Sequence, residues 1–294
     1  MQALFDVVRW DMLAADAQTA FLRDRGAKVR AITTGGHIGC PPPLMAALPA
    51  LGVIAINGVG VDKVDLAEAA RRGIGVTNTP DVLTADVADL AVGLVIDLLR
   101  EIAHGDRHVR EGHWLSGDRP LAHRVSGRKF GIVGLGRIGR ATADRLAAFG
   151  PVRYNGRSAK DAPYDFEPDL LALASWADVL LLTCPANAQT YRLISKDVLD
   201  ALGPQGFLVN VARGAVIDEA ALIEAIAQHR IAGAALDVFE HEPHVPDALQ
   251  QSDKVVLTPH VASATIECRK AMAEIVLGNL QAFLVGEPLL TPVT

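Results

Sequence analysis

The sequence predicts an α/β protein with two doubly wound domains. Apolar runs of strand length alternate with segments of helical period along the whole chain, and one run passes directly into a glycine-rich turn. Half of the 294 residues are hydrophobic and few are aromatic, which suits helices packed on parallel strands. A chain of this length can bury a large core and is expected to divide into two domains.

The first hundred residues alternate strand and helix patterns. We expect strands at 27–33, 53–57 and 75–78, and helices at 44–50, 63–72 and 84–100. Three consecutive prolines, Pro41 to Pro43, precede the first of these helices, and Gly73 ends the second. The polar stretch 107–127 that follows is interpreted as a crossover between the domains.

The remainder of the chain continues the alternation. We expect strands at 130–133, 179–183, 207–211, 233–238 and 254–258, and a helix at 140–149. A final helix at 266–285 is followed by Gly286 and Pro288, and the tail is expected to return to the first domain. Residues 100–266 therefore form a domain inserted in a second, flavodoxin-like domain made of residues 1–99 and 267–294.

Three glycines, Gly134, Gly136 and Gly139, form a G-x-G-x-x-G motif between the strand at 130–133 and a helical segment. Gly134 permits a tight turn, Gly136 lets a pyrophosphate approach the backbone, and Gly139 lets helix and strand pack closely. Arg137 and Ile138 lie where the helix N-terminus offers N–H groups to phosphates. The alternative is a merely structural turn, but the strand-turn-helix context favours a Rossmann dinucleotide-binding domain.

The residue after the next strand bears on which cofactor is bound. An NAD site usually has Asp or Glu there, but this chain has Asn155, with Arg157 and Ser158 behind it. Without a carboxylate a 2′-phosphate is not repelled, and the arginine offers it a charged partner. The sequence predicts a preference for NADP(H), with NAD(H) possible; in the alternative, Arg157 is only a solvated loop residue.

Composition excludes several classes of protein. A formal net charge of −6 argues against a general nucleic-acid or anionic-membrane surface. Cys40, Cys184 and Cys268 are too few and too scattered for a disulfide framework or a zinc site, so we expect no metal and a reducing compartment. We expect no signal peptide in the first ten residues, because Asp6 and Arg9 interrupt their apolar run, and no apolar stretch reaches membrane-spanning length. We expect a cytoplasmic protein.

Three polar residues follow the ends of successive predicted strands: Arg213, Glu242 and His260. Ligands of open α/β sheets bind outside the carboxyl ends of the strands, where these residues lie. An arginine can hold a carboxylate through two hydrogen bonds, a histidine exchanges protons near neutral pH, and a nearby carboxylate favours the protonated histidine. Each residue alone is weak evidence, because a given histidine is usually a surface residue and Glu242 lies in a polar loop. Together at three strand ends they predict a catalytic site.

Six motifs stand in order along the chain: NGVGVD (57–62), TPDVLT (79–84), VGLGRIG (133–139), NVARG (210–214), LDVFEHEP (236–243) and TPH (258–260). In these motifs, and over nearly its whole length, the chain resembles the D-isomer-specific 2-hydroxyacid dehydrogenases. The resemblance implies that Arg213, Glu242 and His260 are catalytic. Arg213 would bind the substrate, His260 would donate the proton and Glu242 would orient the imidazole. The backbone amides of Val59 and Gly60 would bind the substrate carboxylate.

The resemblance also implies a set of cofactor contacts, with Asp237 against the nicotinamide carboxamide. The positions assigned to the cofactor are Gly134, Gly136, Arg137, Ile138, Gly139, Asn155, Arg157, Ser158, Cys184, Pro185, Thr190, Val211, Ala212, Asp237, His260 and Ser263. Ala262 departs from the family, because many relatives have glycine there, and its methyl group is expected to affect ligand fit. The resemblance also implies a homodimer, because in this family the helix corresponding to 84–100 and the arm after it form the dimer.

Within the family, the Arg157-Ser158 pair and the Thr183-Cys184-Pro185 turn resemble the glyoxylate/hydroxypyruvate reductases and hydroxyphenylpyruvate reductases. The expected activity is NADPH-dependent reduction of a small 2-oxoacid of the glyoxylate/hydroxypyruvate type to the D-2-hydroxyacid. Two alternatives are a reductase of bulkier aryl pyruvates and a corepressor-like protein that senses NAD(P)H. The second is disfavoured because the acid that selects NAD is missing.

Overall fold

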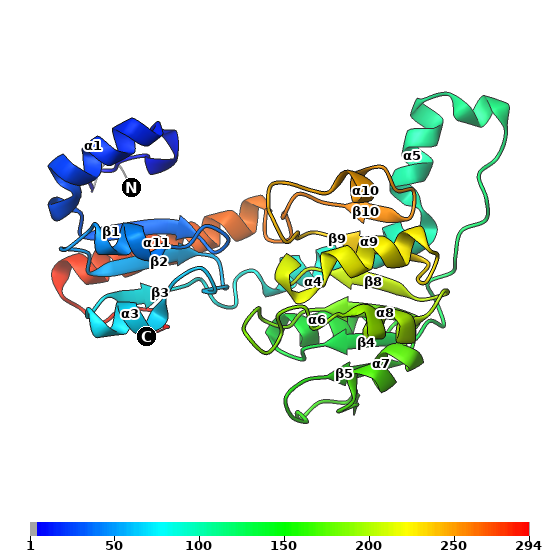
Figure 1. Ribbon diagram of the computed structural model, residues 1–294. Helices are drawn as coiled ribbons and strands as arrows, with labels where there is room; N and C mark the ends of the chain where they lie inside the picture. Colours follow the sequence, from blue (N-terminus) through cyan, green and yellow to red (C-terminus); the bar gives the residue numbers. More distant parts are fainter. Residues whose placement is uncertain (1–4, 294) are drawn as a thin grey trace. The chain divides into compact units, whose positions relative to one another are not determined.

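The computed structural model describes residues 5–293, which divide into two compact units (Figure 1). Unit 1 comprises the chain up to Leu83 and from Ile266 onward, and unit 2 comprises Thr84–Thr265. Unit 2 is therefore inserted in unit 1. The sequence predicts the first boundary after residue 99, but in the structure it lies before helix α4 (Thr84–Arg100). The reason is that α4 packs along α6 (Arg137–Leu146) and contacts strands of the inserted unit.

Unit 2 is built on a parallel seven-stranded sheet with the order β10-β9-β8-β7-β4-β5-β6. The strands are β4 (Phe130–Val133), β5 (Val152–Asn155), β6 (Asp165–Phe166), β7 (Val179–Leu182), β8 (Phe207–Asn210), β9 (Gly233–Leu236) and β10 (Val255–Leu257). Strands β4, β7, β8 and β9 are buried throughout, because helices cover both faces of the sheet. The strand order reverses at β4, which gives the Rossmann arrangement that the sequence predicts.

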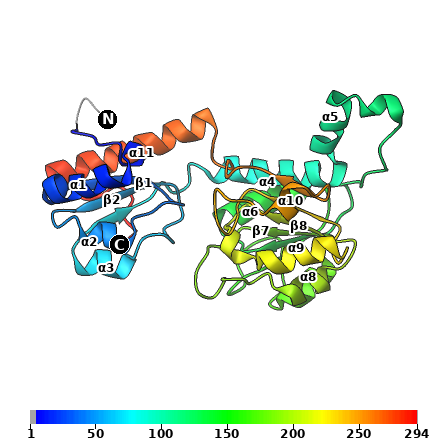
Figure 2. The ribbon, with the colours of Figure 1, turned by 45° about the horizontal axis from the view of Figure 1, so that its top comes forward.

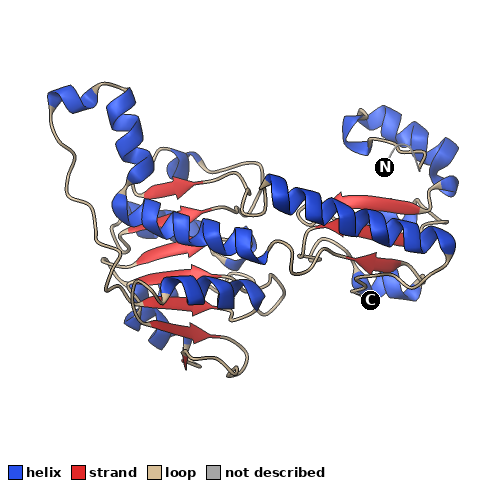
Figure 3. Cartoon of the chain, turned by 180° about the vertical axis from the view of Figure 1, so that it is seen from behind, coloured by secondary structure: helices blue, strands red, loops and turns tan. Residues whose placement is uncertain are grey.

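Besides α4 and α6, unit 2 contains the helices α5 (Ile102–Arg110), α7 (Leu170–Trp176), α8 (Lys196–Leu202), α9 (Glu219–Ala227) and α10 (Asp247–Gln250). Helices α4 and α6 lie on one face of the sheet, and α7, α8 and α9 lie on the other (Figures 1 and 3). The stretch 107–127 was interpreted as a crossover between domains, and this interpretation is wrong. It holds the end of α5 and a short 3-10 helix (His113–Ser116), and it joins α4 to β4 within unit 2.

Unit 1 contains three parallel strands in the order β1-β2-β3: Ala31–Gly35, Val53–Asn57 and Gly75–Thr77. Its helices are α1 (Ala15–Arg25), α2 (Pro42–Ala46), α3 (Leu66–Arg71) and α11 (Ile266–Val285). Side chains of α1, α2 and α3 pack with Ile54 and Ile56 on one face of β2. Helix α11 packs with Val53 and Ala55 on the other face (Figure 2).

The described part of unit 1 is thus an α/β layer structure with helices on both faces, as predicted, and the chain after α11 does return to this unit. The strand order β1-β2-β3 contains no reversal, so a topological switch is seen only in the seven-stranded sheet. Cys40, Cys184 and Cys268 are buried, and none of them forms a disulfide among the described residues. Between residues 5 and 293, no helix combines the length and the apolar character needed to cross a membrane.

Candidate active site

The predicted site residues of unit 2 all lie at one edge of its sheet. They follow the carboxyl ends of β4, β5, β7, β8, β9 and β10, and these strands are hydrogen-bonded neighbours. The glycine motif follows β4, at the point where the strand order reverses and a crevice opens in folds of this kind. The fold therefore brings together the residues assigned to the cofactor and those assigned to catalysis.

The three motif glycines have different surroundings. Gly134 has a φ of +98°, and a Cβ on it would lie 2.7 Å from Cα of Cys184. A Cβ on Gly139 would lie 2.1 Å from the carbonyl oxygen of Gly134. Gly136 caps the ten-residue helix α6, and a Cβ there would meet nothing within 4 Å. Two glycines thus pack the turn, while the third keeps open space at a helix N-terminus, which fits a pyrophosphate. Arg137 and Ile138 follow in the first helical turn.

The turn after β5 carries the residues assigned to cofactor choice. The Asn155 side chain donates to the carbonyl oxygens of Glu167 (2.9 Å) and Pro168 (3.0 Å), so it holds the neighbouring chain segment. Arg157 and Ser158 are exposed, and within residues 5–293 Arg157 forms no ion pair. Asn155 thus stands where an NAD site usually has a carboxylate, and the exposed guanidinium of Arg157 is available to an anion.

The turn after β7 is held by a threonine. Thr190 donates its hydroxyl to the carbonyl oxygen of Pro185 at 2.7 Å, which closes the loop that begins at Cys184. Burial raises the pKa of the Cys184 thiol to about 11, so the thiol is protonated at neutral pH. Cys184 therefore packs the turn beside Gly134 as a neutral thiol.

Arg213 lies in a loop that its own strand fastens. Asn210, the last residue of β8, is fully buried; its side chain donates to the carbonyl oxygen of Arg213 (2.9 Å) and accepts from the amide of Ala212 (2.9 Å). The amide of Val211 continues the sheet by donating to Leu182. The half-buried guanidinium donates to the carbonyl oxygen of Ala212 at 2.7 Å. The asparagine thus fixes the backbone that carries the arginine.

Gly214 brings this loop against the loop that carries Glu242. A Cβ on Gly214 would lie 1.9 Å from the carbonyl carbon of Phe239 and 2.3 Å from the amide nitrogen of Glu240. Only glycine allows the two backbones to approach this closely. The loops after β8 and β9 are therefore one packed assembly.

Glu242 and His260, from two successive loops, are in direct contact. Oε2 of Glu242 lies 2.7 Å from Nδ1 of His260, and Oε1 accepts a hydrogen bond from the amide of Phe239 at 3.1 Å. The side chains are 22% and 29% exposed, so the pair is partly shielded from solvent. A carboxylate held by its own loop can fix the orientation of the imidazole and favour its protonated form.

Asp237 holds the loop that carries His260. Its carboxylate is fully buried and accepts from the Thr258 hydroxyl (2.6 Å) and the amides of Val261 (2.8 Å) and Ala262 (3.0 Å). Its carbonyl oxygen accepts from the amide of His260, whose φ is +52°. Burial raises the pKa of the Asp237 carboxyl, and these hydrogen bonds oppose the rise. The nicotinamide contact of Asp237 stays a prediction, as does that of half-buried Ser263.

Val59 and Gly60 lie in unit 1, in the loop after β2. Among the described residues, no acceptor is found for the amide of either one. The carbonyl oxygen of Gly58 accepts from the amide of Thr79 (2.9 Å), and that of Val59 accepts from the Asn78 side chain (2.9 Å). The loop is therefore fastened through its carbonyl oxygens and keeps two amides for a ligand.

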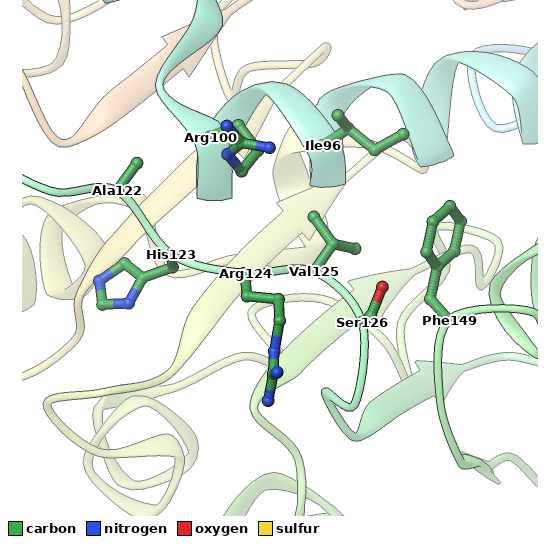
Figure 4. A pocket seen from close by; sticks show the side chains of 8 residues that line it. All are labelled: Ile96, Arg100, Ala122, His123, Arg124, Val125, Ser126 and Phe149. Atoms are coloured by element: carbon green, nitrogen blue, oxygen red, sulfur yellow. The ribbon is translucent and has the colours of Figure 1, made fainter.

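A separate hollow of about 460 Å³ lies at the other end of unit 2 (Figure 4). Its lining includes Arg100 at the end of α4, Val125 before β4 and Phe149 before β5. Segments that lead into strands meet at the amino ends of the sheet, whereas the predicted residues lie at the carboxyl ends. This hollow is thus distinct from the candidate site. Among residues 5–293, no group of three or more metal-ligating side chains occurs.

The sequence reasoning missed the residues that fasten the loops, namely Asn78, Asn210 and Thr258. Asn78 and Asn210 each stand at a strand end before a loop, where an amide side chain can donate and accept at once. This position at a strand end is the feature of the sequence from which the role of both asparagines could have been predicted. Thr258 could be connected to Asp237 only through the pairing of β9 with β10.

Comparison with known proteins shows which family the chain resembles. The family described as "D-isomer specific 2-hydroxyacid dehydrogenase, NAD binding domain" matches residues 92–262. A hydroxyphenylpyruvate reductase of Plectranthus scutellarioides is 47% identical over 279 residues, which cover 94% of this chain and 89% of the relative. A 2-ketogluconate reductase of Gluconobacter oxydans is 47% identical over 274 residues, covering 92% and 88%.

A solved structure is similar over almost the whole chain. It is an NADPH-dependent glyoxylate/hydroxypyruvate reductase of Sinorhizobium meliloti in complex with NADP and malonate. It is 43% identical to this chain, with a TM-score of 0.88, and the match covers 97% of this chain and 87% of that one.

Proposed function

The chain belongs to the D-isomer specific 2-hydroxyacid dehydrogenases and is an oxidoreductase, and on that premise we propose that it reduces a small 2-oxoacid with NADPH. The product is the D-2-hydroxyacid. The observation that carries the proposal is the Glu242–His260 contact of 2.7 Å, at the sheet edge that also bears Arg213 and the glycine motif.

The proton comes from His260. Glu242 contacts Nδ1, so we assign the proton transfer to Nε2 of the ring. In reduction the imidazolium donates this proton to the oxygen that was the keto oxygen, and in oxidation the neutral imidazole takes it back. Glu242 stabilises the charged imidazolium, and its bond to the Phe239 amide keeps the carboxylate in place.

The substrate carboxylate is bound by the amides of Val59 and Gly60 and by Arg213. The guanidinium also polarises the keto oxygen, because it places positive charge where negative charge develops. The short bond to Ala212 and the closed Asn210 loop support a fixed position for this arginine. A planar arginine fork suits a 2-oxoacid, which presents two acceptor groups side by side.

The glycine turn at the start of α6 fits the pyrophosphate of a dinucleotide, since Gly136 leaves space beside the helix N-terminus. Arg157 and Ser158 would hold a 2′-phosphate, and the absence of a carboxylate at Asn155 removes the usual repulsion. When bound, NADPH would supply the hydride that adds to the keto carbon. The NADP complex of the Sinorhizobium relative supports this choice.

The substrate is proposed to be of the glyoxylate/hydroxypyruvate type, in line with the name of the Sinorhizobium relative. The similarity to a hydroxyphenylpyruvate reductase favours an aryl pyruvate as the second candidate. The test is NADPH oxidation with glyoxylate, hydroxypyruvate, 4-hydroxyphenylpyruvate and 2-ketogluconate. We expect the highest kcat/KM for one of the first two. No turnover with any of the four would overturn the proposed activity.

We further propose a homodimer formed through α4, α5 and the segment after them. Large apolar side chains gather there in exposed positions: Ile102, Val109, Trp114, Leu115 and Leu121. Leu115 and Leu121 are 96% and 98% exposed, which is unusual for leucine unless a partner covers it. Sedimentation equilibrium should give a dimer for the wild type and a monomer for Leu121→Asp. A monomeric wild type would refute the homodimer.

A further inference from the structure

The segment after α11 extends the sheet of unit 1. The amide of Val293 donates to the carbonyl oxygen of Val76 at 2.7 Å, and Thr77 and Pro292 form an antiparallel bridge. The amide of Asn78 then donates to the carbonyl oxygen of Thr291 at 3.3 Å. Residues 290–293, here called the tail segment, thus lie along β3 where it leads into Asn78.

A buried asparagine of α11 fixes this tail segment. Asn279 is 1% exposed, and its Oδ1 accepts from the amides of Leu290 (2.9 Å) and Thr291 (3.2 Å). Its Nδ2 donates to Oγ1 of Thr291 at 3.0 Å and to the carbonyl oxygen of Ile275 at 2.9 Å. The Thr291 hydroxyl therefore has a defined position.

This hydroxyl reaches the loop after β2 through Asn78. Oγ1 of Thr291 donates to the carbonyl oxygen of Asn78 at 2.6 Å, and the Asn78 side chain donates to the carbonyl oxygen of Val59 at 2.9 Å. One continuous set of hydrogen bonds joins α11, the tail segment, the end of β3 and the loop. The neighbouring amide of Thr79 fixes the carbonyl oxygen of Gly58.

The geometry of the peptide group gives these bonds a consequence for ligand binding. A peptide unit is planar and trans, so the carbonyl of one residue and the N–H of the next point in opposite directions. Fixing the Gly58 carbonyl orients the N–H of Val59, and fixing the Val59 carbonyl orients the N–H of Gly60. Both amides are thereby turned away from β3, and neither has an acceptor among residues 5–293.

We propose that Asn78 is a positioning residue for the substrate carboxylate, and that Thr291 and Asn279 hold Asn78 in place. The inference rests on the proposed function, because it takes the Val59 and Gly60 amides as the carboxylate site. The bonds act before the substrate arrives, by removing the rotational freedom of two peptide units. Loss of the bonds weakens binding of the 2-oxoacid and leaves cofactor binding, which belongs to unit 2, unchanged.

The experiment compares Thr291→Val, which removes the hydroxyl at nearly constant volume, with Thr291→Ser, which keeps it. Asn78→Asp is the second variant, because its carboxylate cannot donate to the Val59 carbonyl. Thr19→Val is the control, since it removes an exposed hydroxyl bond on α1 of the same unit. For each protein we measure KM for the best 2-oxoacid, KM for NADPH, kcat and the melting temperature.

We expect Thr291→Val and Asn78→Asp to raise KM for the 2-oxoacid about five- to tenfold, the effect of one lost hydrogen bond. Thr291→Ser and Thr19→Val should stay near the wild-type KM, and KM for NADPH should not move in any variant. An unchanged 2-oxoacid KM in Thr291→Val, or an equal rise in Thr291→Ser, would overturn the proposal. So would a matching rise in KM for NADPH, because it would show general damage.

Failure of this inference is separable from failure of the proposed function. Wild-type turnover with unaltered KM in Thr291→Val rejects only the inference, whereas an inactive wild type rejects the proposed activity. Binding of oxamate, an unreactive 2-oxoacid analogue, needs no turnover and is measured by calorimetry in the presence of NADPH. Oxamate binding weakened in Thr291→Val but not in Thr291→Ser supports the proposal. Equal binding to both, or no binding to the wild type, overturns it.

Discussion

The loops at the strand ends of the two units are fastened in different ways. In unit 2 the fastening group is either the last residue of the strand that leads into the loop, as for Asn210, or lies directly after the neighbouring strand, as for Asp237. In unit 1 the carbonyl oxygen of Val59 is held by Asn78, which in turn depends on Thr291, 213 residues along the chain. The side chains assigned to catalysis thus depend on their own sheet. The amides assigned to the substrate depend on a segment from the far end of the sequence.

This difference separates three kinds of residue. Substitution of a group that acts on the substrate should lower turnover. Substitution of a group that holds a loop should lower both activity and stability. Substitution of an exposed group that contacts one ligand should change only the affinity for that ligand. The loss of activity should fall in that order.

The largest loss is expected for His260→Ala. Removing the proton donor should lower kcat in both directions by about 10²–10⁴-fold, the usual contribution of general acid–base catalysis. NADPH affinity, followed by fluorescence titration, should stay unchanged. His241→Ala is the matched control, because this exposed histidine shares the loop of Glu242. A similar loss in both variants would mean that the loop, and not the proton donor, had been disturbed.

Arg213→Lys should come next. Lysine keeps the charge but lacks the planar fork, so kcat/KM for the 2-oxoacid should fall about 10- to 100-fold. NADPH binding should be intact. Arg71→Lys, at an exposed ion pair of unit 1, should behave as the wild type. Wild-type kcat/KM in Arg213→Lys would show that the arginine only supports the strand end.

Asp237→Asn should lower stability and kcat together. The amide oxygen of the new asparagine can still accept hydrogen bonds from two of the three donors. Its NH2 group, however, would face an N–H group of the loop. The unsatisfied group should cost about 1–3 kcal/mol in the free energy of unfolding, measured by urea denaturation. Unchanged stability with lowered kcat would indicate direct contact with a ligand instead.

The same variant gives a test by pH. Because burial raises the pKa of Asp237, the native protein holds this proton more tightly than the unfolded chain does. Relative to Asp237→Asn, the wild type should therefore lose stability as pH rises from the ordinary aspartate range through the raised pKa. A stability difference that does not vary with pH would contradict this.

Of the substitutions in this comparison, the smallest loss of activity is expected for Arg157→Ala, because this arginine is exposed and forms no ion pair within residues 5–293. KM for NADPH should rise about tenfold, the worth of a charge-assisted hydrogen bond, while KM for NADH stays constant. Lys160→Ala, in the same exposed segment, serves as the control. Equal kcat/KM for NADPH and NADH in the wild type would remove the basis for the cofactor preference.

Much of the fold follows from local sequence patterns. The bounds expected for β2, α4 and α11 agree with the structure, because each is a continuous apolar or helical pattern between clear ends. Strand β1 was expected at 27–33 but spans Ala31–Gly35, since residues 26–28 instead form a short 3-10 helix after α1. The boundary before α4 depends on packing against α6, which the periodicity of one helix does not reveal.

The candidate site also contains features that local sequence patterns predict and features that depend on packing. Arg213, Glu242 and His260 could be selected because they follow strand ends, and the fold places them in the loops after three neighbouring strands, β8, β9 and β10. The bond between Asn78 and Thr291 could not be predicted, because no local pattern links positions so far apart. Likewise, the close approach of Gly214 to Phe239 depends on how two loops pack.

The central claim is that His260, oriented by Glu242, supplies the proton. It is tested most directly by the pH profile of kcat/KM for 2-oxoacid reduction in Glu242→Gln beside the wild type. The wild-type rate should fall as pH rises, because reduction needs imidazolium. The glutamine variant lacks the charge that favours imidazolium, so its profile should fall at lower pH. Superimposable profiles would contradict the claim, because Glu242 would then have no influence on the proton of His260.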